Sequence, residues 1–212
     1  MINLSALKNR VEVIPYDTYI VTDLLNSECQ QEMSTHYPTN HFKEFTLQKG
    51  NESVDENFQF KFEFFSLEHN HLLYLQKMGF NPQWTDFINF ITSSKYRECL
   101  SDIVNLNLNN TNYKIEFTRY KEGDFLDAHY DKQSKKILTQ LFYFNTYWKT
   151  SWGGYFHILN PHDIDQTVIA IPPLTNYSVL IKSSINAWHK VSQIHPKAEQ
   201  ARVNMVLEFY ME

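Results

Sequence analysis

A histidine and an aspartate stand two residues apart in the second half of the chain, in His129-Tyr130-Asp131. In an extended strand, side chains at positions i and i+2 point to the same face, so this imidazole and this carboxylate can converge on one ion. A third donor, His189, stands far downstream. Two neighbouring ligands and one distant ligand form a two-histidine, one-carboxylate pattern, which leaves coordination positions open and suits Fe(II) better than structural zinc.

A candidate anion-binding residue, Arg202, follows His189 on the last predicted strand. Along Ala201–Tyr210 the odd positions are apolar, whereas Arg202 and Asn204 share the other face. If that face lines a cavity, the guanidinium needs an anionic partner, which a bound dicarboxylate supplies. Tyr120 and Tyr143, before and after the His-x-Asp motif, offer phenol groups that can donate hydrogen bonds to the same ligand.

Each of these residues also has a simpler interpretation. His129 and Asp131 can be a surface pair, because a His-x-Asp motif alone is weak evidence for a site. His189 can be a half-buried strand histidine, and Arg202 can pair with a surface acid. The tyrosines, taken singly, are more often packed or surface residues. The metal-site hypothesis therefore depends on the combination of residues.

Short strands separated by turn signals follow one another from Asn112 onward. The turns include Glu122-Gly123-Asp124 and Trp152-Gly153-Gly154. We expect eight strands, near residues 113–120, 127–131, 137–146, 154–159, 167–172, 177–182, 187–193 and 201–211. Eight short strands predict a double-stranded β-helix, or jelly roll, whose open mouth is a natural ligand site.

The first half of the chain mixes helix and strand signals. We expect strands at Val11–Thr22 and Phe58–Phe65, a polar loop at Asn40–Asn57, and helices at Ser27–Tyr37 (with Ser27 as N-cap), Glu68–Met78 and Gln83–Asn105. No linker or repeat divides the chain. We therefore predict one α+β domain over residues 1–212, in which 1–111 form helical support and a rim and 112–212 form the jelly-roll core.

Composition excludes several classes of protein. Of the 212 residues, 42% are hydrophobic and 16% aromatic, which is inconsistent with disorder. There are 19 Lys and Arg against 24 Asp and Glu, a net charge of −5 that provides no bulk attraction to nucleic acid or to an anionic membrane. No run approaches the roughly 18 apolar residues of a membrane span, no secretory signal is recognisable, and two cysteines make a disulfide framework improbable. We expect a soluble, cytoplasmic protein.

In combination, these motifs resemble the iron(II)- and 2-oxoglutarate-dependent dioxygenases, in their prolyl-hydroxylase-like branch. The resemblance covers about residues 113–211, with a weaker likeness over Pro15–Met33. Its motifs are Tyr120–Phe125, Leu138–Asn145, Trp148, Trp152-Gly153-Gly154 and Trp188-His189-Lys190-Val191 followed by Arg202. Tyr155 departs from the family pattern, in which an acidic or small residue commonly follows the two glycines.

The resemblance implies a role for each candidate residue. His129, Asp131 and His189 would be iron ligands, and Arg202 would bind the distal carboxylate of 2-oxoglutarate. Tyr143, and also Tyr120 or Asn204, would assist Arg202. The implied reaction is hydroxylation of an unactivated C–H bond by O2, coupled to decarboxylation of 2-oxoglutarate to succinate, with ascorbate as an optional reductant.

The substrate is less defined. We expect an amino acid, either free or in a peptide, and the acidic residues Glu44, Glu52, Asp55 and Glu56 of the expected rim favour some cationic character. The strand-rich half lacks a basic stripe with interleaved aromatics, which disfavours a nucleic-acid demethylase. Two other interpretations stay open: a non-catalytic jelly-roll sensor or binding module, and a cupin-like metalloenzyme that does not use 2-oxoglutarate. Regiochemistry and oligomeric state are not determined by the sequence.

Overall fold

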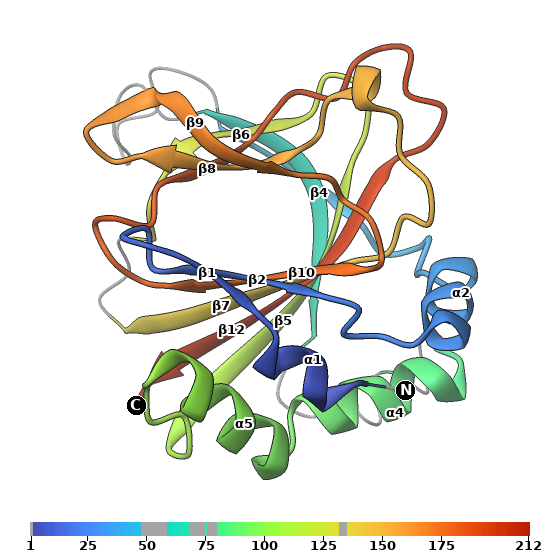
Figure 1. The fold of residues 1–212 in the computed structure, drawn as a ribbon. Coiled ribbons are helices and arrows are strands. Elements are labelled where there is room, and N and C mark those ends of the chain that lie inside the picture. The colour runs from blue at the N-terminus through green and yellow to red at the C-terminus, as the bar shows by residue number, and fades with distance from the viewer. Residues whose placement is uncertain (1, 48–58, 68–74, 76–79, 132–134) are drawn as a thin grey trace.

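The computed structural model describes residues 2–47, 59–67, 75, 80–131 and 135–212. Within this part of the chain, a few helices accompany a large antiparallel sheet (Figure 1). The helices are α1 (Leu4–Lys8), α2 (Ser27–Thr35), α4 (Pro82–Ile91), α5 (Ser94–Val104) and the 3-10 turn η1 (Thr150–Trp152). The strands are β1 (Val11–Val13), β2 (Thr18–Thr22), β3 (Lys43–Leu47), β4 (Phe60–Leu67), β5 (Thr111–Tyr120), β6 (Phe125–His129), β7 (Lys136–Tyr143), β8 (Phe156–Asn160), β9 (Asp163–Ile171), β10 (Tyr177–Lys182), β11 (His189–Val191) and β12 (Arg202–Met211).

The sheet curls into a half-barrel with two facing walls (Figure 1). Its order is β1-β2-β10-β7-β12-β5-β4-β6-β11-β8-β9, and β3 pairs with β4. We call β1, β2, β10, β7, β12 and β5 the major wall, and β6, β11, β8 and β9 the minor wall. Strand β4 joins the walls because it pairs with β5 and with β6. This curvature lets residues of distant strands face one another across the interior.

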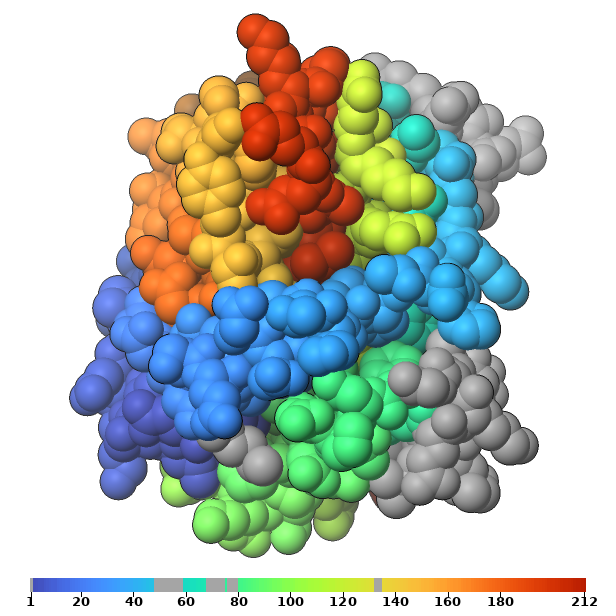
Figure 2. All heavy atoms as spheres, turned by 90° about the vertical axis from the view of Figure 1, so that its right-hand side faces the viewer, coloured from blue at the N-terminus to red at the C-terminus, as the bar shows by residue number. Residues whose placement is uncertain are grey.

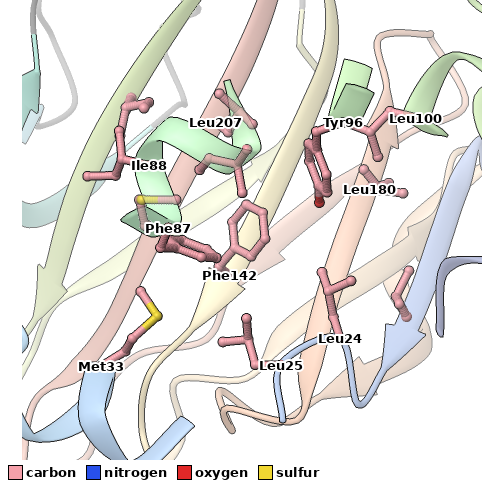
Figure 3. Packing of buried hydrophobic residues seen from close by; sticks show 14 of the residues in the cluster. Leu24, Leu25, Met33, Phe87, Ile88, Tyr96, Leu100, Phe142, Leu180 and Leu207 are labelled. Carbon is pink, nitrogen blue, oxygen red and sulfur yellow. The ribbon is translucent and has the colours of Figure 1, made fainter. Parts of the chain in front are cut away.

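The period-two alternation of the major wall separates two hydrophobic cores. On β7, Phe142 points to the helices, while Leu141 and Tyr143 point between the walls. Figure 3 shows the helix-side core, in which Phe142 and Leu207 meet side chains of α2, α4 and α5. Because each strand residue faces opposite to its neighbours, the wall can bury apolar side chains under the helices and still present polar ones to the interior.

The helical layer lies on the outer face of the major wall, away from the half-barrel interior (Figure 1). From the side in Figure 2, the light-blue segment with α2 and β3 crosses the molecule between the green helical layer and the yellow-to-red strands. The described α-helices therefore support the sheet from behind. None of them is long and apolar enough to cross a membrane.

Helix boundaries differ from the sequence expectations where polar side chains cap the backbone. Asn26, rather than Ser27, caps α2 by accepting from the Cys29 amide, 2.9 Å away. The single helix expected at Gln83–Asn105 is two helices, because Ser93 caps α5 and so begins a new element. The helix expected at Glu68–Met78 lies, except for Leu75, outside the described residues.

Three expectations about where strands and loops lie also need correction. The segment Val11–Thr22 forms the hairpin β1–β2 rather than one strand, with Val11 opposite Ile20. The region expected as the loop Asn40–Asn57 contains β3, which pairs with β4, and its residues from 48 onward lie outside the described part. Strand β6 ends at His129, so Asp131 lies beyond the strand that was expected to carry it.

Candidate metal and co-substrate site

His129, Asp131 and His189 come together in the interior of the half-barrel. Their ligand atoms all lie within 4.8 Å of one another, a separation that allows one metal ion to bind all three. His129 ends β6 and stands directly opposite His189, the first residue of β11. Their ring centroids are 4.2 Å apart. Strand pairing thus fixes the two imidazoles, although 60 residues separate them in the sequence.

Backbone carbonyls orient both imidazoles. Nδ1 of His129 lies 2.8 Å from the carbonyl oxygen of Asp127, and Nδ1 of His189 lies 2.8 Å from that of Ala187. Because a carbonyl only accepts, each Nδ1 carries the proton and Nε2 is the nitrogen able to coordinate. This arrangement is typical of metal-ligating histidines.

The electrostatics of the three residues favour the protonation states that a metal requires. Burial and the neighbouring His189 lower the pKa of His129 to about 3, and burial lowers the pKa of His189 below its usual value. Burial raises the pKa of Asp131, but Lys136 and the two imidazoles outweigh this effect and hold it below its ordinary value. Two neutral imidazoles and one carboxylate are a donor set that fits Fe(II).

Asp131 has two hydrogen-bond donors on strand β7. Lys136 Nζ lies 3.1 Å from its Oδ1, and Thr139 Oγ1 lies 3.2 Å from its Oδ2. Lys136 also binds Glu208 of β12, with 2.6 Å between Nζ and Oε1. The sequence expectations did not include a role for Lys136. One signal pointed toward its partner: the alternation of β12 places Glu208 on the same polar face as Arg202, and so toward the cavity.

Arg202 is buried beside aromatic rings and has no acidic partner in the described part of the chain. Its exposed fraction is 1%. Its Nε donates to the carbonyl of Gly154 at 2.8 Å, and its Nη1 donates to Oδ1 of Asn204. The guanidinium carbon lies 4.7 Å from the ring centre of Tyr120 and 5.2 Å from that of Tyr143. A buried cation that lacks a carboxylate is a site for an anionic ligand.

Tyr143 adds an unsatisfied donor to this end of the site. Its hydroxyl is buried and donates no hydrogen bond within the described part of the chain. Burial raises the pKa of Tyr143, and the charge of Arg202 offsets this only partly. Burial likewise raises the pKa of Tyr120 to about 12. Both phenols therefore keep their protons at neutral pH and can donate to an anion, and the residues present fit a carboxylate at Arg202.

The double-glycine turn positions the carbonyl of Gly154, which accepts a hydrogen bond from Arg202. Gly154 has φ +67°, and a Cβ at this position would lie 2.3 Å from Cδ1 of Ile194 and 3.4 Å from Cδ of Arg202. At Gly153, also with φ +67°, a Cβ would lie 2.1 Å from the carbonyl oxygen of Gln193. Only glycine suits such positions, because other residues rarely adopt this φ and there is no space for a side chain.

One cavity of about 140 Å³ connects the two groups of residues. Its lining contains the predicted residues His129, Asp131, His189, Arg202, Tyr120 and Asn204, together with Lys136, Thr139, Glu116 and Glu208. Tyr143 is not in the lining, but its ring borders the Arg202 guanidinium. Of the described residues before β5, Phe62 of β4 reaches the cavity, and Glu44 is exposed on β3. Glu52, Asp55 and Glu56 lie outside the described residues.

Comparison with known proteins connects this geometry to a family. Residues 115–210 match the model of the 2OG-Fe(II) oxygenase superfamily. No curated protein matches the sequence. The solved structures of similar fold include a prolyl-4-hydroxylase of Pseudomonas putida, with TM-score 0.66, 12% identity and coverage of 99% of this chain and 98% of that one.

Two eukaryotic structures have a similar fold. A prolyl hydroxylase of Trichoplax adhaerens, in complex with a peptide fragment of the hypoxia inducible factor oxygen degradation domain, has TM-score 0.63 and 16% identity over 98% of this chain and 88% of that one. A prolyl 4-hydroxylase of Phytophthora capsici has TM-score 0.65 and 17% identity over 100% of this chain and 66% of that one.

The matched segment contains the His129, Asp131 and His189 cluster and Arg202. The match over residues 115–210, together with the fold and this cluster, indicates an oxygenase enzyme of the 2OG-Fe(II) type. Within that superfamily, its fold is prolyl-hydroxylase-like. The family implies Fe(II), 2-oxoglutarate and O2 as its cofactor and co-substrates.

Proposed function

We propose that this enzyme hydroxylates an unactivated C–H bond of an amino acid, either free or within a peptide, while 2-oxoglutarate is converted to succinate. His129, Asp131 and His189 hold the iron, and Arg202 holds the distal carboxylate of 2-oxoglutarate. When bound, Fe(II) would activate O2 as the oxidant: one oxygen atom would go to succinate as 2-oxoglutarate loses carbon dioxide, and the other would go to the substrate C–H bond. The proposal depends on one observation: a metal-competent cluster lines the same cavity as a buried guanidinium that has no acidic partner among the described residues.

In this proposal, the core is a double-stranded β-helix built from the eight described strands β5–β12. Support comes from the two facing walls, from the antiparallel pairing of β11 with β6 and β8, and from the fold similarity to prolyl hydroxylases. Such a fold positions ligands on rigid strands rather than on loops, which favours precise geometry.

The residues at the Arg202 end bind and orient the co-substrate. The guanidinium and the Tyr143 hydroxyl offer charge-assisted and neutral hydrogen bonds to a carboxylate, while Gly154 and Asn204 keep the guanidinium in place. The rings of Tyr120 and Tyr143, with Phe62 stacked on Tyr120 at 5.1 Å, exclude water from this end. Exclusion of water strengthens the ion pair between Arg202 and the ligand.

The amino-acid class of the substrate is supported by the solved structures of similar fold, which include prolyl hydroxylases, one of them in complex with a peptide fragment. At low sequence identity these similarities concern the fold, so we keep free amino acids and peptides as equal candidates. The exposed carboxylate of Glu44 favours a substrate that carries a cationic group. Glu44 lies on strand β3 and not in the cavity lining, so it would contact a part of the substrate outside the cavity.

Two measurements test the proposed function. Anaerobic addition of Fe(II) and 2-oxoglutarate to the metal-free protein should give the weak visible charge-transfer band of the chelate, and His189→Ala should not give it. Succinate release should then rise above the substrate-free level for at least one member of a panel of free amino acids and short peptides. Absence of the band in the wild type would overturn the proposal and leave a binding module, and metal binding without any effect of 2-oxoglutarate would indicate a metalloenzyme of the cupin-like kind.

A further inference from the structure

Asp131 differs from the two histidines in how its position is determined. His129 and His189 pair with each other in the sheet, whereas Asp131 lies two residues after the end of β6. No strand-pairing hydrogen bond is described for it. Its orientation therefore depends on the contacts of its own carboxylate.

Those contacts come from strand β7, with one donor for each carboxylate oxygen. Lys136 Nζ is 3.1 Å from Oδ1 and Thr139 Oγ1 is 3.2 Å from Oδ2. A carboxylate oxygen has two lone-pair sites, so each oxygen can accept one such bond and still have a site for a metal. With both oxygens engaged from β7, the plane of the carboxylate is fixed.

Lys136 is in turn held by strand β12. Its ammonium lies 2.6 Å from Glu208 Oε1, and the hydroxyl of Tyr210 donates to Glu208 Oε2 at 2.6 Å. In the β7–β12 pairing, Glu208 is opposite Thr139 and Tyr210 is opposite Lys136. The side chains of Lys136 and Glu208 are each 9% exposed, so water competes little for these bonds. A chain of hydrogen bonds from Tyr210 to Glu208 and on to Lys136 therefore connects Asp131 to the paired strands β7 and β12.

We infer that Lys136 is a positioning residue that fixes the orientation of the Asp131 carboxylate toward the metal. The inference rests on the proposed metal site. A lysine suits this place because its charge is balanced by Glu208 while it binds Asp131, so that the pair adds no net charge near the metal. A carboxylate held in one orientation presents its oxygen consistently to the ion that the two histidines bind.

The inference can be tested on metal-free protein with Co(II) as a spectroscopic probe. Lys136→Met leaves Glu208 buried without its counter-ion, so a second variant, Lys136→Met with Glu208→Gln, removes both charges and retains an acceptor for Tyr210. Lys149→Met is the matched control, since it removes a lysine from an exposed ion pair with Glu199. Dissociation constants and visible Co(II) spectra are measured for the four proteins, with circular dichroism to verify folding.

We expect both Lys136 variants to bind Co(II) roughly 10 to 100 times more weakly than the wild type, the range typical for loss of an outer-shell partner. The visible band should also change shape, because a carboxylate that is free to turn alters the coordination geometry around Co(II). The control should match the wild type. A purely structural ion pair would not change the spectrum of the folded double variant.

Wild-type affinity and spectrum in the folded double variant would overturn the inference while leaving the proposed function intact. If the wild type itself fails to bind Co(II), or if His189→Ala binds it equally well, the proposed metal site is wrong and the inference is overturned with it.

Discussion

His129 and His189 face each other across adjacent strands, with their ring centroids 4.2 Å apart and each Nδ1 bonded to a backbone carbonyl. Because both imidazoles present Nε2 to the same space, we expect His129→Ala and His189→Ala to weaken Co(II) binding by more than about 100-fold, beyond the usual effect of outer-shell changes. His157→Ala is the control, since His157 of β8 bonds to Thr167 and is not part of the metal cluster. Equal losses for all three variants would contradict the assignment.

The environment of Arg202 predicts that lysine cannot replace it. Lysine retains the charge, but it lacks the planar fork that bonds to Gly154 and Asn204 and stacks between Tyr120 and Tyr143. We expect Arg202→Lys to weaken 2-oxoglutarate binding by about 100-fold, or nearly 3 kcal/mol. Arg119→Lys, which changes an ion pair with Glu63, should leave this affinity unchanged. Calorimetric titration of the metal-loaded protein measures both, and a wild-type constant for Arg202→Lys would refute the role.

Tyr143→Phe should affect stability and ligand binding in opposite directions. Its buried hydroxyl has no partner in the described structure, so its removal should raise the free energy of unfolding of the ligand-free protein by about 1 kcal/mol. The same change should weaken 2-oxoglutarate binding by about tenfold, through loss of a hydrogen bond to the ligand.

Tyr96→Phe is the comparison for this prediction. The Tyr96 hydroxyl is also buried, but it donates to Gln140 at 3.0 Å. Tyr96→Phe should therefore lower the free energy of unfolding by about 1 kcal/mol and leave 2-oxoglutarate binding unchanged. Urea unfolding and calorimetry give the two quantities. Destabilisation by Tyr143→Phe equal to that by Tyr96→Phe would show that the Tyr143 hydroxyl is satisfied in the ligand-free protein.

Gly123 and Gly153, which both have positive φ, should tolerate alanine very differently. At Gly123 (φ +80°) a Cβ meets nothing within 4 Å, so Gly123→Ala should cost about 1 kcal/mol of backbone strain. At Gly153 the Cβ would lie 2.1 Å from a backbone oxygen, which cannot move aside, so Gly153→Ala should cost about 3 kcal/mol or more. Urea unfolding of the two variants provides the measurement, and similar losses would contradict this steric explanation.

The lowered imidazole pKa values predict an acid-sensitive metal-free protein. The folded state holds the pKa of His129 at about 3, whereas the ordinary value is 6.5, so below about pH 6.5 the unfolded chain binds a proton that the folded chain does not. The stabilisation by neutral His129 is therefore complete above about pH 6.5 and is lost as the pH falls toward 3. Unfolding free energies at about pH 7.5 and about pH 5 should differ more for the wild type than for His129→Asn. Equal differences would show that His129 is not the group responsible.

The strand pattern of the second half could be predicted because it depends on local alternation. The range expected for β10, 177–182, agrees with the structure, and the shared polar face of Arg202 and Asn204 follows from the parity of β12. The break between α4 and α5 was missed, because a hydrophobic stripe continues across Ser93 even though the backbone is capped there. Strand β3 was missed because its alternation is weak and its residues are mostly exposed.

The sequence by itself determined which residues can do chemistry: two histidines, an aspartate and an arginine of suitable types and order, on segments with strand periodicity. The tertiary structure decided which of them meet and what holds them, because these contacts join strands that are distant in the chain. The curvature of the sheet brings His189 opposite His129, and the β7–β12 pairing brings Lys136 and Glu208 to Asp131. Periodicity assigns a side chain to a face of its own strand, but only packing between strands determines its partner across the cavity. The burial of Arg202 without an acidic partner among the described residues is a property of that packing.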